Sequence, residues 1–366
     1  MLDDYLKANL ASWDEAVGLH VGSELYDVAG FKAGRTALSA IELDELGPLV
    51  GEGTRLLHLQ CHFGLDTLSW ARRGAEVTGV DFSGEGIRTA RVLADEVGLA
   101  SRATFVQSDI ESLPDKLTGQ FDVVFTSWGA LIWLADLERW ADVIAHFLRP
   151  GGVFYIAEFH PYAFLLADDA TPDSLRVGYP YFMHGVPQRF DEDGDYADPD
   201  AKVKNTVTFE WLHGFAEIVD PLLRRGLRLD FLHELPYTVP GLQLPFVEKD
   251  DRGMQRVKGH HEDFPLSFTL KMTREGRTSG RAGRPPGDRA RLLGDEDLLA
   301  ILEEAIADER AAQEKYRRGL ERCADPAACE VFEQLLREEQ AHERVLEARY
   351  VEVKKRVGLS GAGRTD

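Results

Sequence analysis

One stretch, residues 56–81, most constrains how this 366-residue chain folds. It reads Leu-Leu-His-Leu-Gln-Cys-His-Phe-Gly-Leu-Asp-Thr-Leu-Ser-Trp-Ala-Arg-Arg-Gly-Ala-Glu-Val-Thr-Gly-Val-Asp. Its two apolar runs predict buried strands, and the segment between them predicts a helix that begins behind a tight turn at Gly64. Such a helix N-terminus presents free backbone amides, and an acid that ends the second strand can accept hydrogen bonds from hydroxyl groups. The stretch therefore favours a nucleoside site with Asp81 on the ribose.

Strands and helices continue to alternate after this stretch. The predicted strands are 55–59, 76–80, 103–107, 121–127, 152–158, 206–212, 227–235 and 266–272, and the predicted helices are 65–73, 85–96, 136–147 and 215–225. Residues 168–205 and 236–265 lack a sustained period and predict loops, the first of them an inserted loop or lid. Parallel strands need helical crossovers of this kind, so the predicted fold is α/β, with a doubly wound and mostly parallel sheet.

Charge and cysteine content exclude several classes of partner. The net charge of −21 disfavours nucleic acid and anionic membrane surfaces, and we find no run of about 18 apolar residues that could span a bilayer. The start, Met-Leu-Asp-Asp-Tyr, lacks the features of a signal peptide. The three cysteines, Cys61, Cys323 and Cys329, are too few for a disulfide framework, and we expect a reducing, cytoplasmic setting.

Residues 1–273 resemble the class I S-adenosylmethionine-dependent methyltransferases. The resemblance rests on the strand-turn-helix of residues 56–73, on Asp81, on Ser108-Asp109 after the third strand, and on Phe-Asp-Val-Val-Phe-Thr-Ser at 121–127. It implies a Rossmann-like, seven-stranded sheet that ends in a reversed hairpin, S-adenosylmethionine as cofactor, and a small-molecule methyl acceptor. A nicotinamide-binding sheet is the alternative, and the missing Gly-x-Gly-x-x-Gly counts against it.

The resemblance also assigns cofactor contacts. Asp81 would bind the ribose and Asp109 would border the adenine. The turn departs from the family, because Gln60 and His62 stand where glycines are usual and only Gly64 remains. Those side chains either hydrogen-bond the methionine part of the cofactor or alter the pocket. The full set of predicted cofactor residues is Gln60, His62, Gly64, Asp81, Phe82, Ser83, Asp109, Ile110 and Ser127.

Ligands of open sheets bind at the carboxyl ends of the strands, which directs attention to the residues after strands four and five. These are Ser127, Trp128, Gly129, Glu158 and His160. We predict His160 as the base that deprotonates the acceptor, with a structural histidine as the alternative. Four aromatic residues before the first strand predict either a lid over the cofactor or a sheet edge: Tyr5, Trp13, Tyr26 and Phe31.

The chain changes character after residue 273. Residues 274–293 are rich in Gly, Pro and Arg and predict a flexible linker, residues 294–356 predict a helical hairpin that turns near 323–326, and 357–366 predict a disordered tail. Glu309 on the first helix and Glu339 with His342 on the second interrupt apolar stripes, and folding the hairpin brings the three to one level. A carboxylate in an apolar seam needs a partner or a cation. Carboxylates with a histidine suit iron or manganese.

The hairpin resembles half of a ferritin-like or rubrerythrin-like bundle, most closely the two-helix encapsulated ferritins. The resemblance rests on Glu309, Tyr316 and Glu339-x-x-His342. A di-iron bundle needs twice these ligands, so it implies a homodimer that binds iron, and an encapsulin shell as partner. One alternative is a hairpin that only dimerises. Another is a ferroxidase or iron-storage protein whose methyltransferase-like domain only binds a ligand. Cys323 and Cys329 could bind metal or pair with each other.

Overall fold

A computed structural model describes most of the chain. The described residues are 2–276 except 168, 184, 243 and 245, then 295–320, and singly 323, 329, 332, 335, 336, 340, 343, 344, 350, 351 and 354. The chain divides into two compact units, Met1–Ser279 and Gly280–Asp366. None of the described helices is long and apolar enough to cross a membrane.

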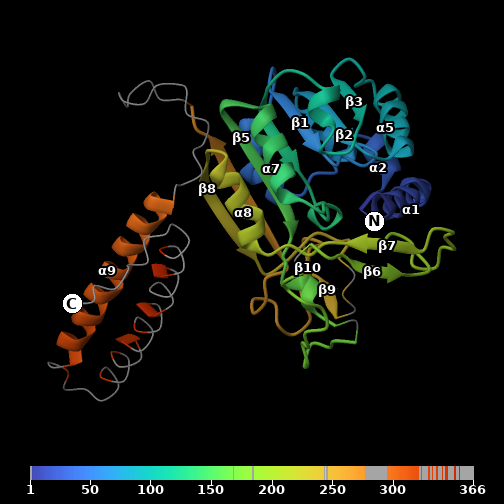
Figure 1. The fold of residues 1–366 in the computed structure, drawn as a ribbon. Helices are drawn as coiled ribbons and strands as arrows, with labels where there is room; N and C mark the ends of the chain where they lie inside the picture. Colours follow the sequence, from blue (N-terminus) through green and yellow to red (C-terminus); the bar gives the residue numbers. More distant parts are fainter. Residues whose placement is uncertain are drawn as a thin grey trace, which may run out of the picture. The chain divides into compact units, whose positions relative to one another are not determined.

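A seven-stranded sheet forms the centre of the first unit (Figure 1). Its strands run in the order β3-β2-β1-β4-β5-β11-β8. Their bounds are β1 Arg55–Leu59, β2 Glu76–Asp81, β3 Ala103–Gln107, β4 Phe121–Thr126, β5 Leu148–Phe159, β8 Leu227–Leu235 and β11 Ser267–Arg274. Strands β1 to β5 pair in parallel, and β11 is antiparallel to both β5 and β8. This confirms the predicted mostly parallel, Rossmann-like sheet with a terminal reversed hairpin.

Helices connect the parallel strands as expected. They are α4 Leu65–Arg72, α5 Gly84–Glu96, α6 Leu113–Lys116, α7 Leu137–Phe147 and α8 Phe215–Arg224. Local capping sets where they begin. The Ser83 hydroxyl accepts from the amide of Gly86 at 2.9 Å to start α5, and the Asp136 carboxylate accepts from two amides to start α7.

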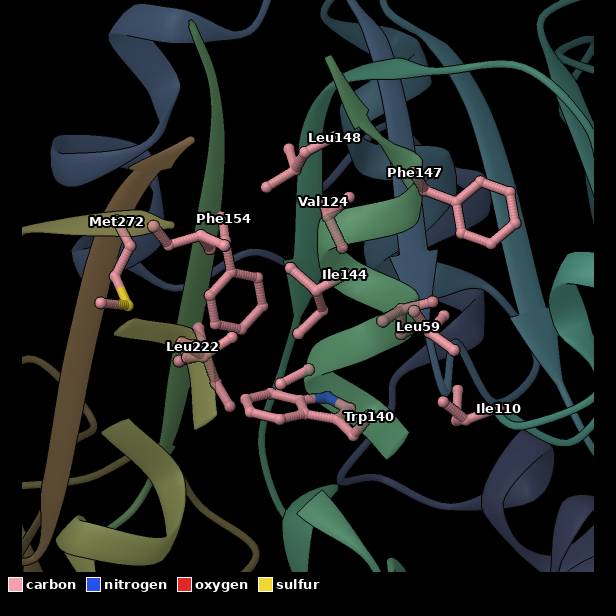
Figure 2. Close-up of a cluster of buried hydrophobic side chains, with 14 of the residues drawn as sticks. Leu59, Ile110, Val124, Trp140, Ile144, Phe147, Leu148, Phe154, Leu222 and Met272 are labelled. Atoms are coloured by element: carbon pink, nitrogen blue, oxygen red, sulfur yellow. The ribbon is translucent and has the colours of Figure 1, made fainter. Parts of the chain in front are cut away.

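Alternate residues of the central strands enter two separate cores, because successive side chains of a strand point to opposite faces. On one face, Trp140 and Ile144 of α7 and Leu222 of α8 pack against Phe154 and Met272 of the sheet (Figure 2). On the other face, Trp70 of α4 packs with strand residues such as Phe125 and Tyr155. Both faces of the sheet are thus covered, which parallel strands require.

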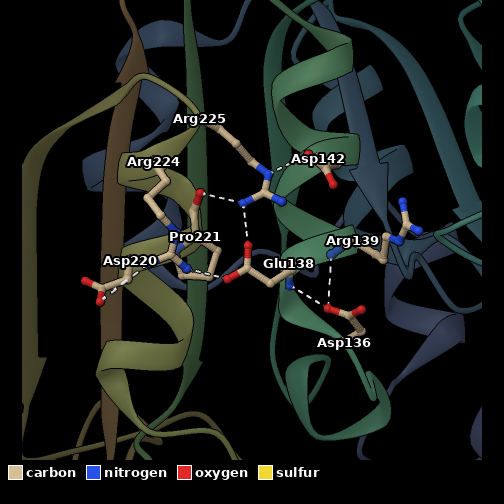
Figure 3. Close-up of polar contacts among 8 residues, drawn as sticks. All are labelled: Asp136, Glu138, Arg139, Asp142, Asp220, Pro221, Arg224 and Arg225. Carbon is tan, nitrogen blue, oxygen red and sulfur yellow. Dashed lines mark hydrogen bonds and ion pairs between the residues drawn. The ribbon is translucent and has the colours of Figure 1, made fainter. Parts of the chain in front are cut away.

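A polar clasp joins α7 and α8 outside the first core (Figure 3). Nε of Arg225 donates to Asp142 at 2.7 Å, and its Nη1 donates to Glu138 at 2.8 Å. Arg224 also pairs with Glu138. The clasp fixes the two helices that cover one face of the sheet.

Two regions carry structure that the sequence pattern did not reveal. The N-terminal segment forms α1 (Leu2–Gly22), α2 (Val28–Lys32) and α3 (Ala40–Glu45). The predicted inserted loop contributes β6 (Gln188–Asp191), which pairs antiparallel with β7 (Val207–Glu210), and the second loop contains the pair β9 (Val247–Lys249) and β10 (Gln255–Val257). The side-chain amide of Asn9 donates to the carbonyl of Phe209 and its oxygen accepts from the amide of Phe209, both at 2.8 Å. The insertion therefore docks on α1.

The second unit contains α9 (Asp295–Leu320). Glu343 accepts hydrogen bonds from Arg310 at 2.5 Å and Gln313 at 2.6 Å, and Tyr350 donates to Glu303. The two cysteines beyond α9, Cys323 and Cys329, form a disulfide.

The predicted iron ligands are largely outside the described residues. Glu339 and His342 are not described, and neither is the side chain of Glu309. Within the described part of the chain, no three His, Cys, Asp or Glu side chains are grouped so as to hold a metal ion. The iron site stays a prediction from sequence.

Candidate active site

A cavity of about 1080 Å³ opens at the carboxyl ends of the parallel strands. Its walls come from α1, from the turn after β1, from the ends of β2 and β4, and from both inserted segments. This is the edge of an open α/β sheet where ligands bind, and the volume is at the upper end of the roughly 300–1,000 Å³ of small-molecule sites.

The turn after β1 has the backbone conformation of a glycine-rich turn, although it contains only one glycine. Gln60, His62 and Gly64 all have positive φ, at 58°, 52° and 83°. The left-handed conformation costs a non-glycine residue roughly 1–2 kcal/mol, so the first two positions hold a strained shape. At Gly64 a Cβ would also lie 2.8 Å from the ring of Phe105. Gly64 is therefore required sterically, whereas the other two positions tolerate side chains.

The side chains of Gln60 and His62 both line the cavity. Nε2 of Gln60 donates to the carbonyl of Ala130 at 2.8 Å, while its Oε1 is buried without a partner. Nε2 of His62 is hydrogen-bonded to Nδ1 of His20 at 2.7 Å, and Nδ1 of His62 is buried without a partner. An unpaired buried acceptor is costly. These two atoms thus favour a polar ligand beside the turn.

Asp81, the predicted ribose acid, ends β2 at the wall of the cavity. Its side chain reaches the cavity wall, and the residue is only 7% exposed. One oxygen accepts from the amide of His62 at 2.8 Å and the other from the amide of Ser83 at 2.9 Å. Burial raises its pKa from 3.8 to about 6, against the lowering effect of these amides. Each oxygen still has a lone pair that can accept from a hydroxyl.

The remaining predicted cofactor residues divide into two groups. Phe82 and Ser127 line the cavity, and the Ser127 hydroxyl donates to Asp66 at 3.0 Å. Ser83, Asp109 and Ile110 are not among the lining residues.

These three residues have structural partners instead. Ser83 caps α5, and Ile110 is buried in the core beneath α7. The exposed Asp109 accepts from the amide of Ser112 at 2.8 Å, which closes the turn before α6. The structure therefore gives Asp109 a turn-forming role, and it does not bring this carboxylate to the cavity as the resemblance implied.

Glu158, at the end of β5, is turned away from substrate. Its two oxygens accept from four backbone amides, those of residues 129, 130, 131 and 159, at 2.5 to 3.0 Å. The residue is 2% exposed, and it holds the loop that follows β4 against the sheet. This bonding saturates the carboxylate and identifies it as structural.

The predicted base, His160, does not line the cavity. Its Nδ1 accepts from the amide of Tyr162 at 3.0 Å, so Nε2 carries the proton and donates to Glu234 at 2.8 Å. Burial lowers its pKa. With both nitrogens engaged and no cavity face, His160 corresponds to the structural alternative, because the end of β5 directs it toward β8.

A buried chain of polar side chains was missed by the sequence reasoning. Asp195, in the insertion, accepts from His20 of α1 at 2.8 Å, and His20 in turn contacts His62. The one available signal was that His20 follows Trp13 by seven positions, which places both on one face of α1. The ring of Trp13 lies 5.8 Å from that of His20 and 5.1 Å from that of His62.

The four early aromatic residues do not share one role. Trp13, Tyr26 and Phe31 line the cavity, with Phe31 also packed in the core beside α4 and α5. Tyr5 packs against Phe209 of β7 with ring centroids 4.4 Å apart. Three of the four residues therefore face the cavity, and Tyr5 packs against β7 instead.

Comparison with known proteins places this geometry in a family. A model described as a methyltransferase domain matches residues 56–152. The ubiquinone biosynthesis O-methyltransferase of Aeromonas salmonicida is 30% identical over 172 residues, which cover 46% of this chain and 68% of that protein. The chain belongs to the S-adenosylmethionine-dependent methyltransferases.

Other relatives match a smaller part of their length. The ubiquinone biosynthesis O-methyltransferase of Psychrobacter cryohalolentis is 32% identical over 127 residues, which cover 34% of this chain and 49% of that protein. The methyltransferase segment thus spans about half the length of the first such relatives. A solved S-adenosylmethionine-dependent methyltransferase from Mesorhizobium loti has 22% identity and a TM-score of 0.43, with 64% of this chain and 99% of that chain covered.

Proposed function

We propose that the first unit transfers a methyl group from S-adenosylmethionine to a small molecule. The observation that carries the proposal is the left-handed turn at Gln60, His62 and Gly64 beside the buried Asp81, with both on the wall of one cavity. Asp81 would hold the ribose hydroxyls, and the unpartnered Oε1 of Gln60 would accept from the ammonium of the methionine part. The donor set of the site therefore fits the family's cofactor.

The chain's own contribution to such a reaction is binding and orientation. When bound, S-adenosylmethionine supplies a methyl group on a cationic sulfur. A lone pair of the acceptor attacks the methyl carbon, and the sulfur is the leaving group. Holding acceptor and methyl carbon in line removes most of the entropic cost of that encounter. Trp13 and Trp133 form an aromatic corner of the cavity, with ring centroids 5.3 Å apart.

Charge on the cavity wall narrows the acceptor to a neutral or cationic molecule. Among the described residues, three arginines line the cavity against nine acids; Arg35 pairs with Asp27 and Arg256 pairs with Asp250, and Arg252 is the third. Glu192 and Glu210 also line the cavity, and burial, with the neighbouring Glu192 charge, raises the pKa of Glu210 to about 7. An anionic acceptor would be repelled. The relatives described above are O-methyltransferases, which favours a hydroxyl as the receiving group.

Isotope transfer tests the proposal. The full chain is incubated with methyl-labelled S-adenosylmethionine and a metabolite extract, and labelled products are sought by mass spectrometry. We expect a neutral or cationic product that is absent with Asp81→Ala. Lack of labelled product together with lack of cofactor binding by calorimetry would overturn the function.

A second proposal concerns the helical tail and rests on its sequence. Glu309, Glu339 and His342 support a dimer that binds iron, and the two-helix encapsulated ferritins that the tail resembles support a protein shell as partner. Iron should copurify with dimers of the full chain and be lost in His342→Ala, as measured by elemental analysis and sedimentation. A metal-free dimer after reconstitution with iron would leave only a dimerising role. Iron oxidation without methyl transfer would favour the ferroxidase alternative.

A further inference from the structure

Three side chains from distant parts of the sequence form a continuous hydrogen-bonded chain at the cavity wall. Asp195 lies between β6 and β7, His20 lies on α1, and His62 lies in the turn after β1. Oδ1 of Asp195 is 2.8 Å from Nε2 of His20, and Nδ1 of His20 is 2.7 Å from Nε2 of His62. All three line the cavity, and His20 is fully buried.

Which ring nitrogens carry protons in this series of hydrogen bonds follows from the Asp195 carboxylate at one end. Oδ1 of Asp195 also accepts from the amide of Ala197 at 2.7 Å, which holds the carboxylate in place. An ionised carboxylate only accepts, so Nε2 of His20 carries a proton and Nδ1 of the same ring is an acceptor. Nε2 of His62 must then donate to it. What remains is a lone pair on Nδ1 of His62, the buried atom without a partner.

Aromatic rings surround the two imidazoles. The ring of Tyr26 stacks on His20 at 5.0 Å, and the ring of Tyr196 lies 4.7 Å from it. The two tyrosine hydroxyls bond to each other, so they leave the imidazole nitrogens to the chain. Burial and the neighbouring His20 lower the pKa of His62, which keeps the ring neutral before the reaction. The charged or titratable neighbours are Asp195, the two tyrosines, and Asp81, which accepts from the His62 amide.

We propose that His62 is the general base of the methyl transfer and that His20 and Asp195 are positioning residues that fix its tautomer and receive the proton. The proposal rests on the methyltransferase function and deepens it. It assigns the acceptor to molecules with a proton to lose, a hydroxyl or an amine. It also explains why a side chain occupies a turn position where glycine is usual.

The step balances within these groups. A lone pair of the acceptor forms the bond to the methyl carbon, and the carbon–sulfur bond breaks with its electron pair left on sulfur. The acceptor's proton moves to Nδ1 of His62. The proton on Nε2 of His62 passes to Nδ1 of His20, whose positive charge lies against the Asp195 carboxylate.

The insertion completes the base. The segment before β7 lies along α1, where Glu15 accepts from the amides of Lys204 and Asn205 at 2.9 and 3.0 Å. Removing Asp195 and loosening the insertion are separable changes. Glu15→Gln therefore serves as the matched control, since it weakens the same docking without touching the proton chain.

Nuclear magnetic resonance tests the hydrogen bonds that join Asp195, His20 and His62 without any turnover. Nitrogen-labelled full chain is compared with His20→Gln and His62→Gln to assign the two rings. We expect His62 to be protonated at Nε2 in the native chain, to become a mixture of tautomers in Asp195→Ala, and to keep its tautomer in Glu15→Gln. A native His62 protonated at Nδ1, or a tautomer indifferent to Asp195→Ala, would overturn the proposal.

Kinetics separate the base from a mere cofactor contact. With the acceptor found by isotope transfer, His62→Gln should lower kcat by about 10²–10⁴-fold while cofactor affinity stays within about threefold. Asp195→Ala should shift the pH profile of kcat, and Glu15→Gln should not. Full turnover by His62→Gln, or a loss of cofactor affinity that matches the loss of kcat, would overturn the assignment of His62 as the base and leave the methyltransferase function standing. Absence of cofactor binding by the native chain overturns the methyltransferase function and the base with it.

Discussion

The ends of β2 and β5 each carry a buried acid at the same edge of the sheet, yet the two acids serve different purposes. Asp81 accepts one backbone amide on each oxygen and lines the cavity. Glu158 accepts four amides and is closed to ligands. Position at a strand end therefore does not identify a ligand-binding group. What distinguishes the two is how many hydrogen bonds the fold has already made to the carboxylate.

The same criterion divides the two histidines near these strand ends. His160 uses both ring nitrogens in fixed contacts with Tyr162 and Glu234. His62 uses only Nε2, and its buried Nδ1 has no partner. His160, which follows β5, has the position expected of a catalytic base. His62, in the turn after β1, has the unused lone pair that acid–base chemistry needs.

Removing the β2 carboxylate should have the largest effect. Asp81→Ala deletes two charge-assisted hydrogen bonds to the ribose, worth about 1.5–3 kcal/mol each, so the cofactor Kd should rise at least about 100-fold in calorimetry. Asp109→Ala is the matched control, because Asp109 follows the neighbouring strand β3 and lies outside the cavity. This substitution should leave Kd within about twofold. Unchanged affinity in Asp81→Ala would remove the distinction between the strand ends.

Removing the β5 carboxylate should damage the fold instead of a ligand contact. Glu158→Ala leaves four buried amides without an acceptor, which costs roughly 3 kcal/mol or more. At about 2–4 °C per kcal/mol, Tm of the first unit should fall by about 6–12 °C in calorimetry. Glu158→Gln keeps one acceptor oxygen and should lose less. A native-like Tm in Glu158→Ala would mean that the acid is free for another role.

Acid should weaken cofactor binding through Asp81. Its pKa of about 6 means that the carboxylate gains a proton below that pH and loses an acceptor, so Kd should rise by up to about tenfold per unit between pH 6 and pH 4. Asp81→Asn should flatten this dependence.

Stability should respond to the same proton with the opposite sign. The pKa of Asp81 is raised above its ordinary value of 3.8, so the folded state holds the proton more tightly than the unfolded chain. Its contribution to the free energy of unfolding is therefore present below pH 3.8 and lost as pH rises through 6. Affinity that increases on acidification would contradict a carboxylate on the ribose.

Altering the β5 histidine should have the smallest effect. His160→Gln loses contacts worth about 1 kcal/mol, and kcat and cofactor Kd should both stay within about twofold. Glu234→Gln, which changes only the exposed partner of the ring, should be smaller still in unfolding measurements. A kcat loss of about 100-fold in His160→Gln would return the base to the end of β5.

Elements whose pattern is local could be predicted from the sequence. Strands β1, β3 and β8 have the bounds that their apolar runs predicted, and helices α4, α5, α7 and α8 begin within one residue of the predicted positions. The strand β6 and the helix α1 escaped prediction. β6 gains its hydrogen bonds from β7, fifteen or more residues away, and α1 is stabilised by contacts such as that of Asn9 with β7. Neither partnership leaves a local period.

The site was predictable in the part that the turn itself builds. Gln60, His62, Gly64 and Asp81 are close in sequence, and their backbone conformations follow from one strand-turn-helix-strand. The roles of Asp109 and His160 depended on which neighbours claimed their polar atoms. Those neighbours could not be read from spacing.

The sequence by itself determined the parallel sheet, the turn at residues 60–64 and the acid that ends β2, because apolar periodicity and turn chemistry act over a few residues. Only the tertiary structure decided which strand-end groups stay open to a ligand, and it alone brought Asp195 and His20 to His62. The physical reason is that a polar atom's availability is what remains after all its neighbours, near and far in the chain, have made their hydrogen bonds.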